Sequence, residues 1–563
     1  MTPGLRRLSA GRRRVWAPAA VLGVLAVALV AAAPSSAVRV AAFLVAAGYA
    51  ARVLRRQGPL AADRTARAVL FLVTGVGVFL PALIGFFNLM GHTLARLTDP
   101  AAPASRGDLL ATTLVAAGLV LAARHWPARL GEPAFVALAL VSATALKLAY
   151  VLLVRVEPVS DFADMWALTS SLAERGLDAT RGSLVFLFHR WSYFERVLPY
   201  LLPLRLAFGP RPESYSVANV VVGSLASLLV YRMTRSWFGA GAARVALVVS
   251  LAAVETVLAA GIPTHDVPGA FYTLIALVLF LAAWRLHSRG RERAALLAGA
   301  GFGLAVAVLD LQRTTGSVML LTVTLLGLAM AAVERGAAGP PAGERHRRLL
   351  AALALVFIPW MVFGTADRVL RAAELRVPPA LRERAGWRGL AAATDSWGDG
   401  SYAYCYENYT APYGVSKADW RSLALAKLAT DLHHHPGARV TSYLRKSEAL
   451  FDLGSQTYFY LHGAELRGFG PVYREREERI LAVSRWFSAL FLGALVVAFC
   501  RLWTLPEVPL PGLLPLLYLA VFTAILLFLA EVQPRYLYPI WYLGAIYIGA
   551  LFGPGCPGSS RSS

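Results

Sequence analysis

Residues 268–287, PGAFYTLIALVLFLAAWRLH, decide the fold class of this chain. The run is twenty residues long, and its basic residues, Arg285 and His287, both stand at its end. A helix of about 20 apolar residues crosses the ~30 Å hydrocarbon core of a bilayer. Runs of similar length recur along the sequence, and we expect spanning helices near 15–33, 38–54, 68–88, 108–122, 133–154, 215–231, 243–260, 268–287, 294–310, 315–333, 349–365, 482–503, 510–530 and 536–553. The sequence therefore predicts an all-α, polytopic membrane protein with about fourteen transmembrane helices.

The composition agrees with this class. Hydrophobic residues make up 57% of the 563 residues and charged residues 16%, whereas a soluble domain carries about 25% charged residues. The formal net charge of +22 comes mostly from arginines in short segments between apolar runs. The positive-inside rule explains these arginines better than nucleic-acid binding does. The three cysteines, Cys405, Cys500 and Cys556, show neither metal-site spacing nor a disulfide framework.

Alternate short loops are basic, which predicts that both termini face the cytoplasm. An apolar run ending near Ser35-Ser36-Ala37 leaves open a cleaved signal peptide in place of the first helix. Four regions are expected: an N-terminal four-helix extension (1–132), a transmembrane core (133–365) with an outer loop at 155–214, an extracytoplasmic loop domain (366–481), and C-terminal helices with a short tail (482–563). Residues 183–208 read as helices lying on the membrane surface, and the periodicity of 419–453 predicts helix broken near Pro436.

Ionisable residues collect at helix ends on the predicted outer face. Acids and bases at one depth suggest a polar cavity rather than isolated lipid-facing charges. Simpler roles remain open: Asp161 as a helix cap, His265 and Asp266 as a helix start, and Arg313 and Arg535 as headgroup anchors. The run of three histidines at 433–435 is expected to be solvated rather than metal-binding. The full set is Asp161, Asp164, His265, Asp266, Asp310, Arg313, Glu531, Arg535 and Tyr536.

Several stretches in order resemble the GT-C superfamily of membrane glycosyltransferases. These include Ser160-Asp161-Phe162 opening the first outer loop, the glycine-rich 299–310 followed by Arg313, and the terminal Glu531, Arg535, Tyr536 pattern. The groups resembled are dolichyl-phosphate-mannose protein mannosyltransferases, aminoarabinose transferases and rhizobial lipopolysaccharide glycosyltransferases, over about 133–553. The second acid, Asp164, stands three residues after the first rather than beside it, which leaves the subfamily open.

The resemblance implies transfer of a sugar from a polyprenyl-phosphate donor to a cell-envelope lipid, glycan or protein, with inversion, at the outer face of a bacterial plasma membrane. Asp161, with Asp164 near it, would be the catalytic base. A divalent cation, Mg or Mn, is possible, with Asp161, His265 and Asp266 as candidate ligands in the second-loop polar site. The donor phosphate would be held by Arg313, Arg535 and Lys446, with Glu531, Tyr536 and Asp310 in support.

Two alternatives remain. A lipid-linked glycan enzyme of the O-antigen ligase or polymerase kind would share the donor class and the membrane face. A transporter or flippase is the second alternative, and Lys147 is the clearest deep charge in its favour.

Overall fold

The structure is a computed structural model. It describes residues 73–98, 106–125, 131–159, 161–184, 191–313, 315–336, 342–376, 417–434, 436–461, 463–467, 470–471, 474–504, 510–529 and 533–553. The expected spans 15–33 and 38–54, and the site candidate Glu531, lie outside these residues.

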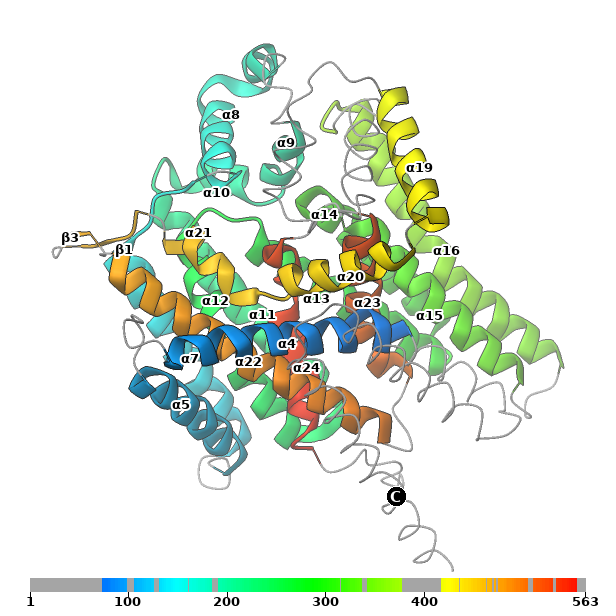
Figure 1. Cartoon of the computed structure of the whole chain (residues 1–563). Coiled ribbons are helices and arrows are strands. Elements are labelled where there is room, and N and C mark those ends of the chain that lie inside the picture. Colours follow the sequence, from blue (N-terminus) through cyan, green and yellow to red (C-terminus); the bar gives the residue numbers. More distant parts are fainter. Residues whose placement is uncertain are drawn as a thin grey trace, which may run out of the picture.

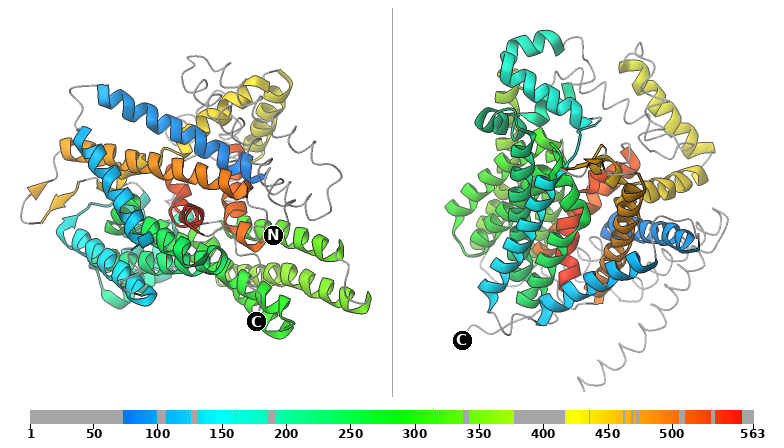
Figure 2. Two further views of the ribbon diagram at one scale, coloured as in Figure 1. Left: turned by 90° about the horizontal axis from the view of Figure 1, so that it is seen from below. Right: turned by 90° about the vertical axis from the view of Figure 1, so that its left-hand side faces the viewer.

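Seven helices of the described chain are long and apolar enough to cross a membrane (Figures 1 and 2). This confirms the prediction of an all-helical, polytopic protein, while the number fourteen stays a prediction. Shorter apolar stretches lie in α15 (Gly316–Gly336), α23 (Leu514–Leu529) and α24 (Ile540–Ala550), and α16 (Ala342–Ala372) carries Pro359 inside it. The seven are η1 (Gly75–Phe79) with α4 (Leu80–Thr98), α5 (Arg106–His125), α7 (Glu132–Leu153), α11 (Pro212–Ala252), α13 (Asp266–Ser288), α14 (Glu292–Arg313) and α22 (Arg474–Thr504).

The 41-residue α11 is a hairpin of two helical limbs rather than one rod. Gly239 has a φ of 85°, in the left-handed region that glycine adopts without a Cβ clash. Leu228 packs on the same hydrophobic cluster as Leu251, although a straight helix would separate them by about 35 Å. The two spans expected at 215–231 and 243–260 therefore correspond to the two limbs, which meet at Gly239.

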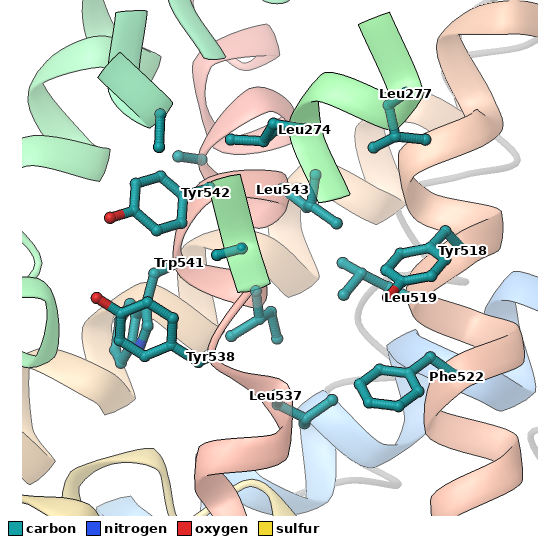
Figure 3. Close-up of a cluster of buried hydrophobic side chains, with 14 of the residues drawn as sticks. Leu274, Leu277, Tyr518, Leu519, Phe522, Leu537, Tyr538, Trp541, Tyr542 and Leu543 are labelled. Carbon is teal, nitrogen blue, oxygen red and sulfur yellow. The ribbon is translucent and has the colours of Figure 1, made fainter. Parts of the chain in front are cut away.

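The core gathers around α24, in which every residue from Ile540 to Ala550 is buried. This helix packs against α11, α22 and α23. Figure 3 shows its Trp541 and Tyr542 near Leu274 of α13, with the aromatic side chains of α23 close by. Because neighbouring helices rather than lipid bury every residue of α24, this helix forms the centre of the bundle.

Three helices that are not among the membrane-crossing candidates, α8 (Asp161–Leu184), α9 (Trp191–Val197) and α19 (Lys417–His434), lie at one end of the molecule in Figure 1. Residues 183–208 form helices α9 and α10, while their expected place on the membrane surface stays a prediction, and the expected break at Pro436 separates α19 from α20. The remaining short elements of the described chain are α10 (Leu201–Phe208), α12 (Val254–Leu258), η2 (Ala259–Gly261), α20 (Pro436–Leu450), η3 (Leu453–Gln456), α21 (Thr457–Leu461), η4 (Leu510–Leu513) and η5 (Pro534–Leu537).

A three-stranded antiparallel sheet, which the all-α prediction did not foresee, adds a small β element. Its strands β1 (Val154–Arg155), β2 (Glu465–Leu466) and β3 (Gly470–Pro471) are two residues long each. Val154 pairs with Leu466, and Leu466 pairs with Gly470. Because β1 directly follows α7 and β2 follows α21, the sheet joins two segments that the sequence predicts to belong to separate loops.

Candidate active site

The first feature of the site is an ion pair between Asp161 and Arg535. Asp161 opens α8, and the Arg535 Nη2 donates a hydrogen bond to its Oδ2. The guanidinium also lies over two rings, with its Cζ 5.5 Å from the centre of Phe162 and 5.8 Å from that of Tyr536. Burial alone would lower the pKa of Arg535, but the Asp161 carboxylate outweighs it and the pKa rises. The two side chains are only 11% and 10% exposed, so Asp161 does more than cap a helix.

A second ion pair joins Asp266 to Arg313. Asp266 begins α13, and its backbone N–H donates to Thr264 Oγ1 at 3.0 Å, so the predicted helix start is confirmed. Arg313 ends α14, and its Nη2 contacts both Asp266 Oδ1 and the backbone oxygen of Arg535, the latter at 2.9 Å. The second contact links the two ion pairs into one assembly.

Gly269 allows Arg313 to reach this position. A Cβ at residue 269 would lie 2.7 Å from Arg313 Cγ, closer than real Cβ contacts come. The side chain of Arg313 therefore crosses the first turn of α13 where a residue other than glycine would displace it.

A third arginine, Arg196 of α9, approaches the same place. Burial first, and then the charges of Arg313, Arg196 and Arg535, lower the pKa of His265 well below its usual range. His265 is thus neutral at physiological pH, and Arg196, Arg313, Arg535, Asp161 and Asp266 form what we call the arginine cluster. With three guanidinium groups against two carboxylates, the arginine cluster has an excess positive charge, and guanidinium is the side-chain group best shaped to bind phosphate oxygens in pairs.

Tyr460 of α21 borders the arginine cluster and was not foreseen from the sequence. Its ring centre lies 6.4 Å from that of Phe162, which in turn lies beneath Arg535. Burial and Glu255 raise the pKa of Tyr460, so its phenol is neutral. Within the described part of the chain the buried hydroxyl makes no hydrogen bond. An unpaired buried hydroxyl costs about 1–3 kcal/mol, which suits a group that awaits a ligand.

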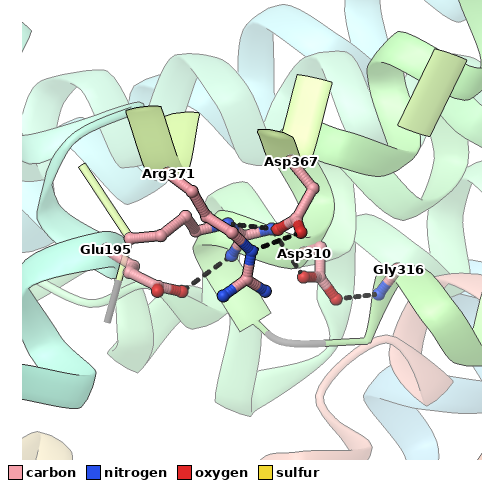
Figure 4. A network of polar contacts seen from close by, with 6 residues as sticks. Glu195, Asp310, Gly316, Asp367 and Arg371 are labelled. Atoms are coloured by element: carbon pink, nitrogen blue, oxygen red, sulfur yellow. Dashed lines mark hydrogen bonds and ion pairs between the residues drawn. The ribbon is translucent and has the colours of Figure 1, made fainter. Parts of the chain in front are cut away.

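Asp310 belongs to a different group of charges, although it precedes Arg313 by one helical turn. Arg376 is 4% exposed and contacts three carboxylates. We call Arg376, Arg371, Glu195, Asp310 and Asp367 the Arg376 network (Figure 4). Asp310 also accepts a hydrogen bond from the backbone N–H of Gly316 at 3.1 Å. The contacts of Arg376 are Nη1 to Glu195 Oε2 at 2.7 Å, Nη2 to Asp310 Oδ2 at 2.9 Å and Nε to Asp367 Oδ1 at 3.0 Å, while Arg371 Nε contacts Asp367 Oδ2 at 2.7 Å.

Burial lowers the pKa of Arg376, but the carboxylates of Asp310 and Glu195 outweigh burial and the pKa rises. Arg376 was not predicted as a site residue because it stands alone in the sequence, without a motif. Consecutive residues of α9 divide between the two groups, since Glu195 joins the Arg376 network and Arg196 joins the arginine cluster.

The remaining candidates vary in position. Asp164 is half-buried on α8, one turn after Asp161. Lys446 is fully buried on α20, a helix that packs against the η5 turn carrying Arg535. Tyr536 lies beside Arg535, and His433 and His434 are exposed as expected.

The proposed metal ligands Asp161, His265 and Asp266 do not form a metal-binding group. Among the described residues no set of three or more histidine, cysteine, aspartate or glutamate side chains could hold an ion. Asp161 instead faces Arg535, and Asp266 faces Arg313. The carboxylates that would bind a cation are therefore engaged by guanidinium groups.

Comparisons with known proteins give similarities at low identity. No family model matches the chain, and no curated protein sequence matches it. ArnT from Cupriavidus metallidurans, solved with undecaprenyl phosphate, is 16% identical with a TM-score of 0.34 over 74% of this chain and 75% of its own. The archaeal oligosaccharyltransferase AglB from Archaeoglobus fulgidus, solved with an inhibitory peptide and a dolichol phosphate, is 14% identical with a TM-score of 0.36 over 74% of this chain and 50% of its own.

TM-scores below 0.5 do not establish a common fold.

Proposed function

We propose that the chain is a membrane glycosyltransferase that moves a sugar from a polyprenyl-phosphate donor to a cell-envelope acceptor at the extracytoplasmic face. The observation that carries this proposal is the arginine cluster, in which a buried aspartate and an excess of guanidinium groups meet at the ends of several helices. Transfer from a lipid phosphate requires a base for the acceptor hydroxyl and fixed cations for the phosphate that leaves. The sequence resemblance to GT-C enzymes supports the same reaction.

Asp161 is the proposed base. The acceptor O–H bond breaks as its oxygen attacks the anomeric carbon, and the proton passes to the Asp161 carboxylate. The bond between the anomeric carbon and the phosphate oxygen breaks with its electron pair on that oxygen. A single displacement of this kind inverts the anomeric centre. The new glycosidic bond and a free polyprenyl phosphate are the products.

Arg535, Arg313 and Arg196 are the proposed phosphate ligands. Arg535 contacts Asp161, so the donor phosphate has to take the place of the carboxylate on Arg535. This exchange frees Asp161 to accept the proton from the acceptor. The base is thus released only when a donor is bound.

The proposal is tested with proteoliposomes containing the purified protein and a panel of labelled polyprenyl-phosphate sugars, with matched polyprenyl-diphosphate sugars beside them. We expect one monophosphate donor to yield free polyprenyl phosphate together with a glycosylated acceptor from added envelope extract. Turnover of diphosphate donors alone would replace the proposal with a ligase- or polymerase-like enzyme. Movement of intact donor across the bilayer without cleavage would replace it with a flippase.

A further inference from the structure

Glu255 is a buried carboxyl group that the mechanism above does not use. It lies on α12, between the α11 hairpin and the turn that leads to Asp266, and it is 2% exposed. In the described part of the chain no lysine or arginine forms an ion pair with it. Carboxyl groups are almost never fully buried without a partner, so its role requires an explanation.

Its partners are two hydroxyl groups from distant parts of the sequence. Glu255 Oε1 accepts hydrogen bonds from Thr457 Oγ1 and from Ser484 Oγ, each at 2.9 Å. Both donors are fully buried, Thr457 at the start of α21 and Ser484 within α22. One carboxyl oxygen therefore ties α12 to both α21 and α22.

Burial and a nearby carboxylate favour the neutral form of Glu255 over the opposing effect of its two hydrogen bonds. Burial raises the pKa of Glu255 to about 8; the hydrogen bonds from Thr457 and Ser484 oppose this rise, and the charge of nearby Asp452 adds to it. The other charged and titratable groups on the surrounding elements are Arg485, which is held by Asp452, the phenols of Tyr460 and Tyr538, and Lys147, which bonds to Thr256 at 3.2 Å.

Tyr460 stands three residues after Thr457 on the same short helix. The hydrogen bond from Thr457 to Glu255 therefore sets where the Tyr460 hydroxyl lies relative to Phe162 and Arg535. We infer that Glu255, as a neutral carboxylic acid, is a positioning residue that holds α21 and so presents Tyr460 to the donor bound at the arginine cluster. The identity of the ligand in this role rests on the proposed function. The contact between α12 and α21 does not depend on it.

Ionisation should release α21. A carboxylate without a cation is unfavourable in a buried site, so above the pKa of Glu255 the protein gains by opening α12 to water. With a pKa of about 8, the neutral fraction falls about tenfold between pH 7 and pH 9.

The experiment compares wild type, Glu255→Gln and Glu255→Ala in detergent, with undecaprenyl phosphate as the binding probe. We expect wild-type affinity to fall about tenfold between pH 7 and pH 9. Glu255→Gln keeps an oxygen that accepts from both hydroxyls and cannot ionise, so its affinity should match wild type at pH 7 and change less than twofold by pH 9. Glu255→Ala should be weak at both pH values. Tyr460→Phe should be several-fold weaker than wild type at pH 7.

A second readout does not depend on lipid binding. At pH 9, amide hydrogen exchange in the 457–461 segment should be faster in wild type than in Glu255→Gln. At pH 7 the two proteins should exchange at the same rate. At each pH the intrinsic exchange rates are the same for both proteins. Equal exchange at both pH values, or a Glu255→Gln variant as weak as Glu255→Ala, would overturn the inference. If undecaprenyl phosphate binds none of the proteins while the exchange difference is present, the proposed function fails and the positioning contact stands.

Discussion

The arginine cluster and the Arg376 network lie next to each other and share two helices, but they balance charge in opposite ways. In the Arg376 network the carboxylates exceed the guanidinium groups, and each nitrogen of Arg376 has a carboxylate within 3.0 Å. In the arginine cluster guanidinium groups are in excess. Buried polar atoms without a hydrogen bond among the described residues occur in both places: the Tyr460 hydroxyl and His265 Nδ1 beside the arginine cluster, and Arg376 Nε and Asp367 Oδ1, which are in ion-pair contact, in the Arg376 network.

We propose that this difference in charge balance separates a part that maintains the structure from a part that binds a ligand. A closed set of charges contributes to stability mainly because removing one member leaves the others buried and unpaired. A set with excess charge and unpaired polar groups gains its missing partners from a ligand. The predictions below test this division by asking which cluster changes activity and which changes stability.

The largest effect is expected from Asp161→Asn. Loss of the base should lower the transfer rate by about 10²- to 10⁴-fold, the usual contribution of a general base. The amide still accepts a hydrogen bond from Arg535, so the protein should fold and insert as wild type does. Labelled-donor turnover and membrane yield are the measurements, with Glu132→Gln, whose carboxylate pairs with Arg244 outside the arginine cluster, as the control. Near-normal turnover by Asp161→Asn would remove this residue from the role of base.

Arg376→Met should mainly lower stability, whereas Asp161→Asn should mainly lower the transfer rate. The Arg376→Met substitution removes the cation that Glu195, Asp310 and Asp367 share, although Asp367 keeps its contact with Arg371, and breaking a buried ion pair costs about 3–5 kcal/mol. We expect a large drop in thermal unfolding temperature and in folded yield. Arg535→Met should lower the unfolding temperature much less, because its partner Asp161 belongs to the arginine cluster, where guanidinium groups are in excess. Equal losses in the two variants would contradict the division between the clusters.

Arg313→Lys and Arg535→Lys test the phosphate site. Lysine keeps the charge but loses the paired hydrogen bonds to phosphate oxygens. Because a charged hydrogen bond contributes about 1.5–3 kcal/mol, donor affinity should fall about 10- to 100-fold with little change in stability. Arg244→Lys is the control, since Arg244 lies outside the arginine cluster. Its Nη1 pairs with Glu132 Oε2 at 2.6 Å. Unchanged donor affinity in both test variants would reject the assignment.

Gly269→Ala should have a smaller effect. The added methyl group displaces Arg313 without changing any charge, so we expect donor affinity to fall several-fold. Gly301→Ala is a suitable control, because a Cβ there would have no neighbour closer than 4.0 Å. If Gly269→Ala binds donor with wild-type affinity, donor binding does not depend on the position of the Arg313 side chain against Gly269.

The smallest effect concerns His265 and pH. The folded-state pKa of His265 is below its unfolded value, so the neutral form stabilises the protein above about pH 6.5, and this contribution is lost as the pH falls. The transfer rate should therefore show no titration of His265 between about pH 6 and 8. His265→Gln should leave that part of the pH profile unchanged. A rate step in wild type that vanishes in His265→Gln would show that the imidazole is protonated during turnover.

The sequence allowed prediction of the features that depend on local pattern. Apolar runs located the spans, and polar residues at their ends located Asp161, Asp266, Arg313 and Arg535. The partners of these residues depend on tertiary packing. Asp161 and Arg535 are 374 residues apart, and Asp310 and Arg313 lie on one helix but face different clusters. Arg376, Tyr460 and Glu255 stand outside any motif, so only the packing of α9, α12, α16 and α21 identifies them.

Because Asp161 and Arg535 lie far apart in the sequence, the ribosome makes them at different times. A ribosome-bound chain exposes Asp161, His265 and Asp266 long before the η5 turn has been made. Until that turn enters the membrane, Asp161 has no guanidinium from residue 535 beside it and the arginine cluster is incomplete. A nascent or prematurely terminated chain would therefore be unable to hold a lipid phosphate, and catalytic competence would begin only when insertion reaches the last helix of the described fold.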